Sequence, residues 1–113
     1  MSQLLSWAKH EFELNQRDNN GTTEREHLLQ VERQTKKKPK RLTNPTRFPS
    51  VVSHIWSAFI SLNSARSMGF SGPNPISYSE LRAWKELTGS SLKPWEIEAI
   101  KKLDKVYLEI ANG

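Results

Sequence analysis

The chain has 113 residues, a hydrophobic content of 35%, a net charge of +5 and no cysteine. A chain of this length fits one small domain that buries about two thirds of its unfolded surface, so short apolar stripes must supply the core. The composition excludes disulfides, thiol nucleophiles and cysteine-ligated metals. It shows neither a signal-peptide pattern nor the roughly 20-residue apolar run that crosses a membrane, which fits a cytoplasmic protein.

The first predicted helix covers residues 2–16. Ser2 can cap its amino end, and apolar side chains follow at spacings of three and four residues. These side chains are Leu4, Leu5, Ala8 and Phe12. A turn over residues 17–22 follows, with Asn20-Gly21 as its strongest signal.

The second predicted helix covers residues 24–34 and is mostly polar. Thr23 and Glu26 have the spacing of a capping box at its amino end. Its apolar side chains are only Leu28, Leu29 and Val31. We expect either an ordinary surface helix or one that packs loosely and becomes firm when a partner binds.

A basic linker over residues 36–47 follows. Five of the 17 Lys and Arg residues lie at positions 36–41, which leaves 12 basic and 12 acidic residues outside this run. The five are Lys36, Lys37, Lys38, Lys40 and Arg41. Pro39 and Pro45 disfavour regular structure. The run fits a solvated hinge, and it also has the composition of a nuclear import signal or a nucleic-acid patch.

The strongest helical pattern starts at Pro49 and continues to about Ser67. Its apolar side chains form two neighbouring ridges, which are Val51, Ile55, Phe59 and Leu62 on one side and Val52, Trp56 and Ile60 on the other. One ridge faces the core of its own domain. The other either completes that core or contacts another molecule.

Residues 69–95 hold three of the five glycines and three of the six prolines, which predicts an ordered corner. Within this corner, Ser77 and Glu80 form a capping box, so a helix should begin just after Ser77. That helix is predicted over residues 78–88. Gly89 suits a left-handed conformation at its carboxyl end.

The last predicted helix covers residues 94–111, with Pro94 in its first turn. Its inner apolar stripe is Ile97, Ile100, Leu103, Val106, Tyr107 and Ile110. No segment shows the sustained alternation of a strand. We therefore predict an all-α fold, in which three carboxy-terminal helices form a small bundle and one or two amino-terminal helices are joined to it by the basic linker. The expected division is an arm and linker over residues 1–47 and a bundle domain over residues 48–113.

The sequence shows no recognised catalytic or metal-binding motif. The histidines are His10, His27 and His54, which lie in separate segments without helical metal-ligand spacing. The Gly-Phe-Ser-Gly segment at residues 69–72 precedes a proline, which removes a backbone donor and disfavours a phosphate loop. We predict a non-enzymatic protein without a cofactor or metal.

Aromatic residues are numerous for a bundle of this size. They are Trp56, Phe59, Phe70, Trp84 and Trp95. All five fit a core role, but Phe70 lies between glycines in a loop, and Trp95 follows Pro94 at a helix start where one side meets solvent. These two could rim an apolar groove, and aromatic side chains in such grooves dominate binding energy. We predict that the five residues bind a partner helix.

The ordered series of short motifs from Phe48 to Leu108 resembles the tail assembly chaperones of long-tailed bacteriophages. The motifs are Ile55-Trp56, Phe59, Leu62, Ser64-Ala65-Arg66, Gly69-Phe70, Gly72-Pro73, Pro75-Ile76-Ser77-Tyr78, Ala83-Trp84, Leu87-Thr88-Gly89, Pro94-Trp95-Glu96-Ile97 and Leu103-Asp104. Residues 25–35 look like the lead-in of such proteins. The basic run at residues 36–41 departs from the milder segment expected there.

The resemblance implies that the protein binds the tape measure protein and the major tail tube protein while the tail is built. It also implies action in the cytoplasm of the infected or lysogenic host and absence from the mature virion. In such families a longer, frameshifted product often accompanies a shorter one, and the sequence fits either version. It does not fix the oligomeric state.

Two other functions remain open from the sequence. One is a nucleic-acid-associated accessory protein that acts through residues 36–41, with weak and salt-sensitive contacts. The other is a minor structural tail component that stays in the particle. Neither alternative requires a catalytic residue.

Overall fold

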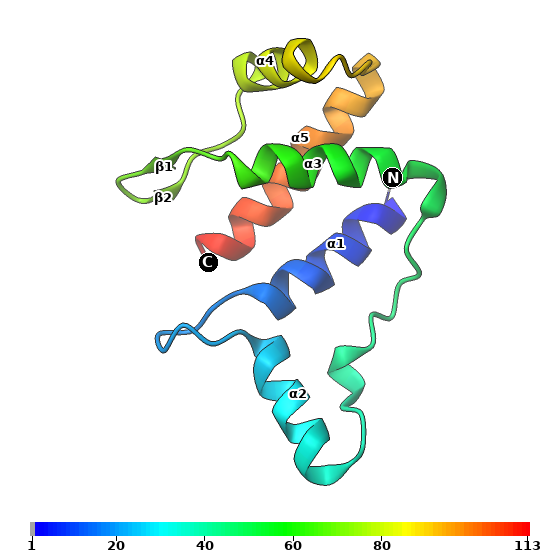
Figure 1. Cartoon of the computed structure of the whole chain (residues 1–113), viewed down its shortest axis with the longest axis vertical. Helices are drawn as coiled ribbons and strands as arrows, with labels where there is room; N and C mark the ends of the chain where they lie inside the picture. Colours follow the sequence, from blue (N-terminus) through cyan, green and yellow to red (C-terminus); the bar gives the residue numbers. More distant parts are fainter. Residues whose placement is uncertain (1) are drawn as a thin grey trace.

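A computed structural model describes residues 2–113, and within them the fold is helical apart from a short hairpin and an isolated bridge (Figure 1). The α-helices are α1 (Ser2–Asn15), α2 (Glu24–Thr35), α3 (Ser53–Ser64), α4 (Tyr78–Thr88) and α5 (Pro94–Ala111). The 3-10 turns are η1 (Lys40–Leu42) and η2 (Ser50–Val52), and the hairpin strands are β1 (Met68–Gly69) and β2 (Gly72–Pro73). The all-α prediction is confirmed.

Helix α4 begins and ends where the sequence predicts because both ends carry their own capping chemistry. The hydroxyl of Ser77 accepts the backbone N–H of Glu80 at 3.1 Å, and the Glu80 carboxylate accepts the backbone N–H of Ser77 at 3.3 Å. Gly89 adopts φ 68° at the carboxyl end. At α2 only half of the expected capping box forms, because Glu26 pairs with Arg17 instead of Thr23.

The core lies where α3 and α5 cross, and α1 packs against α5 (Figure 1). Completely or nearly completely buried side chains come from all three helices and include Leu4, Ala8, Ile55, Phe59, Ile100 and Leu103. Helix α1 therefore packs into the bundle formed by the carboxy-terminal helices. The expected division after residue 47 stays a prediction.

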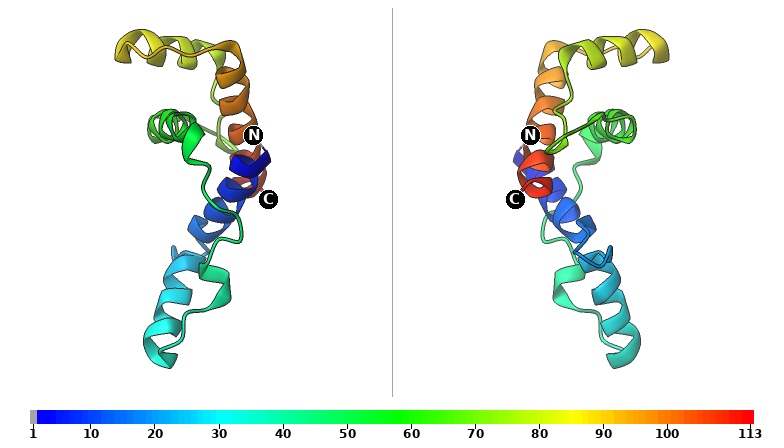
Figure 2. Two further views of the ribbon diagram at one scale, coloured as in Figure 1. Left: turned by 90° about the vertical axis from the view of Figure 1, so that its right-hand side faces the viewer. Right: turned by 90° about the vertical axis from the view of Figure 1, so that its left-hand side faces the viewer.

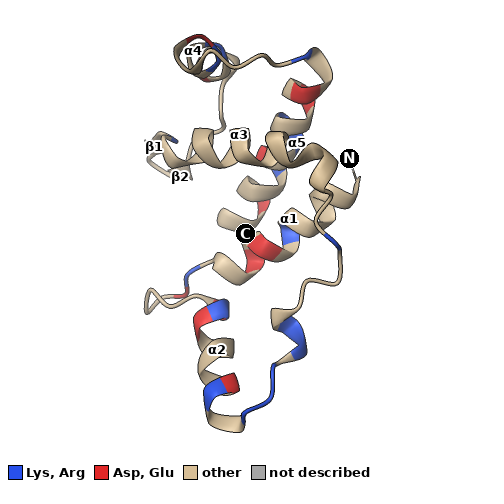
Figure 3. Cartoon of the chain, turned by 45° about the vertical axis from the view of Figure 1, so that its right-hand side comes forward, with Lys and Arg blue, Asp and Glu red and all other residues tan. Residues whose placement is uncertain are grey.

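Helix α2 and the chain that returns from it extend away from this core (Figure 2). The molecule measures 48 × 36 × 22 Å along its principal axes. Lys, Arg, Asp and Glu residues lie on the extension and on α1, α4 and α5, whereas α3 carries none of these four residue types (Figure 3). Within residues 2–113 no helix has the length and apolar character needed to cross a membrane.

The hairpin after α3 was not predicted, because strands of two residues are too short to show alternation. Met68 pairs with Pro73 and Gly69 with Gly72 in antiparallel register. Gly72 has φ 123°, a conformation open to glycine and rarely to other residues. Helix α3 ends at Ser64, before the predicted end, because the chain turns here into the hairpin.

A buried ion pair fixes the hairpin to α5. Arg66 donates to the Asp104 carboxylate at 2.5 Å, and both side chains are almost completely buried. Asp104 also accepts the backbone N–H of Ile76 at 2.9 Å, while Arg66 donates to the Asn74 carbonyl at 2.8 Å. The guanidinium group lies 4.5 Å from the ring centre of Tyr107. This network joins both ends of the hairpin to the core.

Glu96 in the first turn of α5 should make stability depend on pH in the acid range. Its carboxylate accepts the backbone N–H of Lys93 at 2.8 Å and pairs with His54, and these contacts lower the pKa of Glu96. A lowered folded pKa means that the stabilisation is complete above about pH 4.3, where free glutamate titrates, and is lost as pH falls through the folded pKa. Unfolding midpoints measured against pH should fall less steeply in acid for Glu96→Gln than for the wild type.

The matched control for this measurement is Glu98→Gln, because Glu98 lies on the same helix and is exposed. Its acid dependence should follow the wild type. Identical acid profiles for the wild type and Glu96→Gln would contradict the assignment.

Candidate functional site

A cleft of about 490 Å³ lies between α1, α3 and α5. Ten lining residues come from the carboxyl halves of α1 and α5, from α3 and from the residue after α1, and Arg17 adds an eleventh. The full lining is Glu11, Phe12, Asn15, Gln16, Arg17, Trp56, Ile60, Asn63, Tyr107, Ile110 and Ala111.

Packed aromatic rings form part of the cleft wall. The ring centre of Phe12 lies 5.7 Å from that of Trp56 and 5.3 Å from that of Tyr107. Such edge and tilted arrangements are favourable for aromatic pairs and hold the rings in place. Ile60 extends this surface with a side chain that is 44% exposed. The wall therefore offers preformed apolar surface from three different helices.

Polar groups at the cleft edge are already paired. Glu11 accepts a hydrogen bond from Arg25 at 2.5 Å, and Arg17 lies 3.5 Å from Glu26. Gln16 donates to the Ile110 carbonyl at 2.8 Å. An apolar wall with a satisfied polar edge suits an apolar side chain or an amphipathic helix.

The predicted partner-binding aromatics do not gather at this cleft. Of the five, Trp56 lines it. Phe59 is completely buried in the core, so its ring stabilises the fold and offers no surface, which corrects its expected role. Trp84 is half-buried on α4 and donates from Nε1 to the hydroxyl of Ser61 at 2.9 Å.

Phe70 and Trp95 are both exposed, but they do not rim a common groove. Phe70 is fully exposed at the hairpin turn, and Trp95 is 51% exposed at the start of α5. The nearest ring to Trp95 is that of His54, at 6.4 Å between centres. Neither residue lines the cleft, so the expected groove rim is not part of it.

Sequence reasoning missed most of the cleft. Phe12, Tyr107 and Ile110 were assigned to apolar stripes of their own helices, and Ile60 to the second ridge of α3. The sequence did contain one signal for the cleft, which was the second apolar ridge of α3. One apolar face is enough to pack a helix against a core, so Trp56 and Ile60 on a second face indicated additional apolar surface. The positions of α1 and α5 beside it depend on tertiary packing.

The basic run is exposed and lies at the far end of the extension (Figure 3). Arg41 differs from the four lysines of the run because it forms ion pairs, with Glu24 at 2.9 Å and with Glu13 at 3.1 Å. These ion pairs raise the pKa of Arg41. Among the described residues, no carboxylate lies within ion-pair distance of Lys36, Lys37, Lys38 or Lys40.

The linker is fastened to α1 by hydrogen bonds and so differs from a free hinge. His10 donates to the Arg41 carbonyl at 2.9 Å, and the Asn44 side chain donates to the Trp7 carbonyl at 3.0 Å. Gln3 donates to the carbonyl of Arg47 at 2.7 Å.

Lys36 ends α2 in the left-handed conformation, with φ 60°, which an L-residue other than glycine adopts at a cost. Lys36→Gly should therefore stabilise the end of α2 by about 1 kcal/mol, which amide hydrogen exchange of the last turn would detect. Gly89 has the equivalent position in α4, with φ 68°, so Gly89→Lys should destabilise the end of α4 by a similar amount. Faster exchange in Lys36→Gly would contradict this reasoning.

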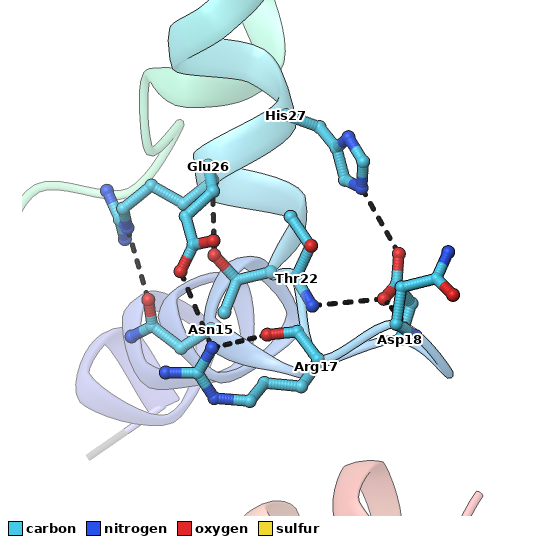
Figure 4. Close-up of polar contacts among 10 residues, drawn as sticks. Asn15, Arg17, Asp18, Thr22, Glu26 and His27 are labelled. Carbon is cyan, nitrogen blue, oxygen red and sulfur yellow. Dashed lines mark hydrogen bonds and ion pairs between the residues drawn. The ribbon is translucent and has the colours of Figure 1, made fainter.

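The corner between α1 and α2 is built from polar contacts (Figure 4). The Asp18 carboxylate accepts the backbone N–H groups of Asn20 at 2.8 Å and Thr22 at 3.0 Å, and His27 donates to it at 3.1 Å. The Thr22 N–H and His27 lower the pKa of Asp18. Arg17 donates to the carbonyl of Gly21 at 2.6 Å. These contacts set the direction in which α2 leaves α1.

The histidines fall into three separate environments. His10 contacts the linker, His27 contacts Asp18, and His54 contacts Glu96. Within residues 2–113 no group of three or more histidine, aspartate or glutamate side chains is arranged to hold a metal ion.

Comparison with known proteins gives one family. A sequence model described as phage tail assembly chaperone matches residues 31–109, which is more than half of the chain. No curated protein matches the sequence, and no solved structure matches the fold. The matched region contains α3, the hairpin, α4 and nearly all of α5.

Proposed function

The chain belongs to the phage tail assembly chaperone family, and from this we propose that it binds an amphipathic helix of the tape measure protein in the cleft between α1, α3 and α5. The observation that carries the proposal is the cleft itself, because its aromatic wall continues into the half-exposed Ile60. An amphipathic helix buries its apolar stripe in such a groove through residues spaced three and four apart.

The charge pattern supports a helix as the occupant. Helix α3 contributes Trp56, Ile60 and Asn63 to the cleft and carries no charged residue, so the bound segment meets no charge from this helix. The charges that do lie at the edge, Glu11 and Arg17, are paired with residues of α2. Polar residues that flank the apolar stripe of the bound helix can lie against such an edge.

The same proposal includes the major tail tube protein as a second partner. Exposed apolar residues outside the cleft supply a separate surface, with Met68 and Phe70 on the hairpin. Aromatic anchors of this kind dominate binding energies. The protein then works without catalysis in the host cytoplasm, and it leaves before the tail is complete.

Co-expression tests the proposal directly. Helical fragments of the tape measure protein from the same phage should become more soluble with this chain and should co-purify with it. The tail tube protein should be captured in a parallel experiment. Unchanged solubility and no complex with any tape measure fragment would overturn the proposal. Mass spectrometry of purified virions separates a chaperone, which is absent from them, from a minor structural component, which is present.

A second candidate function is favoured by the four exposed lysines at the end of the extension. Cations without carboxylate partners can contact the phosphates of a nucleic acid. Such binding should weaken steeply with salt and should vanish when Lys36, Lys37, Lys38 and Lys40 are replaced by glutamine. Titrations in low salt that show no binding would remove this candidate.

A further inference from the structure

The extension formed by residues 16–47, called the arm below, is held to the rest of the protein mainly by polar contacts. Helix α2 has no buried side chain: of its apolar residues, Leu28 is partly buried, and Leu29 and Val31 are each 43% exposed. The views in Figure 2 show the arm reaching away from the helices that form the core. Apolar burial within α2 therefore contributes little to its position.

Ion pairs add to the hydrogen bonds that fasten the linker to α1. Arg25 pairs with Glu11 on α1 at 2.5 Å and also donates to Asn15 at 3.1 Å. Arg41 pairs with Glu13 on α1. Within the arm, Arg17 pairs with Glu26 and His27 with Asp18 at the corner shown in Figure 4, and Arg41 pairs with Glu24. These groups are partly exposed, so salt screens their attraction.

We propose that α2 is latched to α1 by these ion pairs and detaches when they are screened or replaced, while the linker keeps its hydrogen bonds to α1 and the helices α1, α3 and α5 remain folded. Regions with few buried apolar contacts open first and independently of the core. A latched arm provides a point at which a charged partner can compete for the carboxylates of α1.

Detachment changes the surface beside the cleft. Leu14 near the carboxyl end of α1 is completely buried although it stands outside the main core cluster, and α2 is the helix next to this end (Figure 1). Glu11 and Asn15 line the cleft and both contact Arg25. Opening would uncover Leu14 and free two polar groups at the cleft edge. This link to the cleft rests on the proposed function, whereas the detachment does not.

Hydrogen exchange of the full chain, followed by mass spectrometry, tests the latch. Raising NaCl from about 0.01 M to about 1 M shortens the screening length from about 30 Å to about 3 Å. We expect the amides of residues 24–35 to exchange about tenfold faster in high salt, with the amides of α3 and α5 unchanged as an internal reference. Arg25→Gln should give the same acceleration in low salt.

Arg82→Gln is the matched control, because Arg82 forms an exposed ion pair with Glu86 on α4, away from the arm. It should leave the exchange of residues 24–35 unchanged. Equal exchange of residues 24–35 at both salt concentrations would overturn the proposal. Acceleration of the arm and the core together would also overturn it, because the arm would then open only when the whole protein unfolds. Both results are independent of whether a tape measure fragment binds.

Discussion

Asp104→Asn is expected to lower the free energy of unfolding by about 3–5 kcal/mol, because it leaves the guanidinium group of Arg66 buried without its counter-charge. Both side chains of the pair are at most 4% exposed, so water cannot replace the lost partner. An asparagine could still accept the N–H of Ile76, but its amide group would then face the guanidinium group with donors of its own. The loss is large for a small domain, whose total stability is about 5–15 kcal/mol.

Urea unfolding followed by circular dichroism measures this loss. Glu86→Gln is the matched control, since it removes a carboxylate from an exposed pair with Arg82 and should change stability by less than about 0.5 kcal/mol. A loss below about 1 kcal/mol for Asp104→Asn would show that the pair does not hold the hairpin to α5.

Replacing both partners by apolar residues should not restore the stability. In other proteins such replacement of a buried pair is often neutral. Here Asp104 also satisfies the N–H of Ile76, and Arg66 also satisfies the carbonyl of Asn74. Leucine at both positions would leave the buried N–H of Ile76 without a partner, and an unpaired buried group is destabilising.

Local chemistry explains which parts of the fold could be predicted from the sequence. Helix α4 was predicted to the residue because Ser77 and Gly89 cap its two ends, and α5 because Pro94 occupies its first turn. The hairpin escaped prediction because it depends on the turn at Gly72 and on Arg66. Neither leaves a periodic pattern in the sequence.

The candidate site was predicted only in part because it depends on how helices pack. Trp56 was identified, since the apolar arc of α3 is wider than one core face needs. Its neighbours Phe12 and Ile110 come from opposite ends of the chain, and each looked like an ordinary core residue of its own helix. The exposure of Phe70 was expected from its glycine neighbours, but its distance from Trp95 was set by the fold.

Ile60→Asp is expected to weaken binding of a tape measure fragment by at least about 30-fold, which corresponds to the roughly 2 kcal/mol loss of a hot-spot residue. Ile60 lines the cleft beside Trp56, and the new carboxylate would have to lose water when an apolar stripe covers it. The side chain is 44% exposed before binding, so the variant should fold. Calorimetric titration with the fragment identified by co-expression gives the affinity.

Leu87→Asp is the matched control for this prediction. It introduces the same charge at an apolar side chain that is 87% exposed on α4 and does not line the cleft. Because the two variants have the same net charge, long-range attraction or repulsion should affect both similarly, and only Ile60→Asp should lose affinity in addition. If the two variants bind the fragment equally well, the tape measure helix binds elsewhere, and the exposed hairpin residues Met68 and Phe70 become the surface to test.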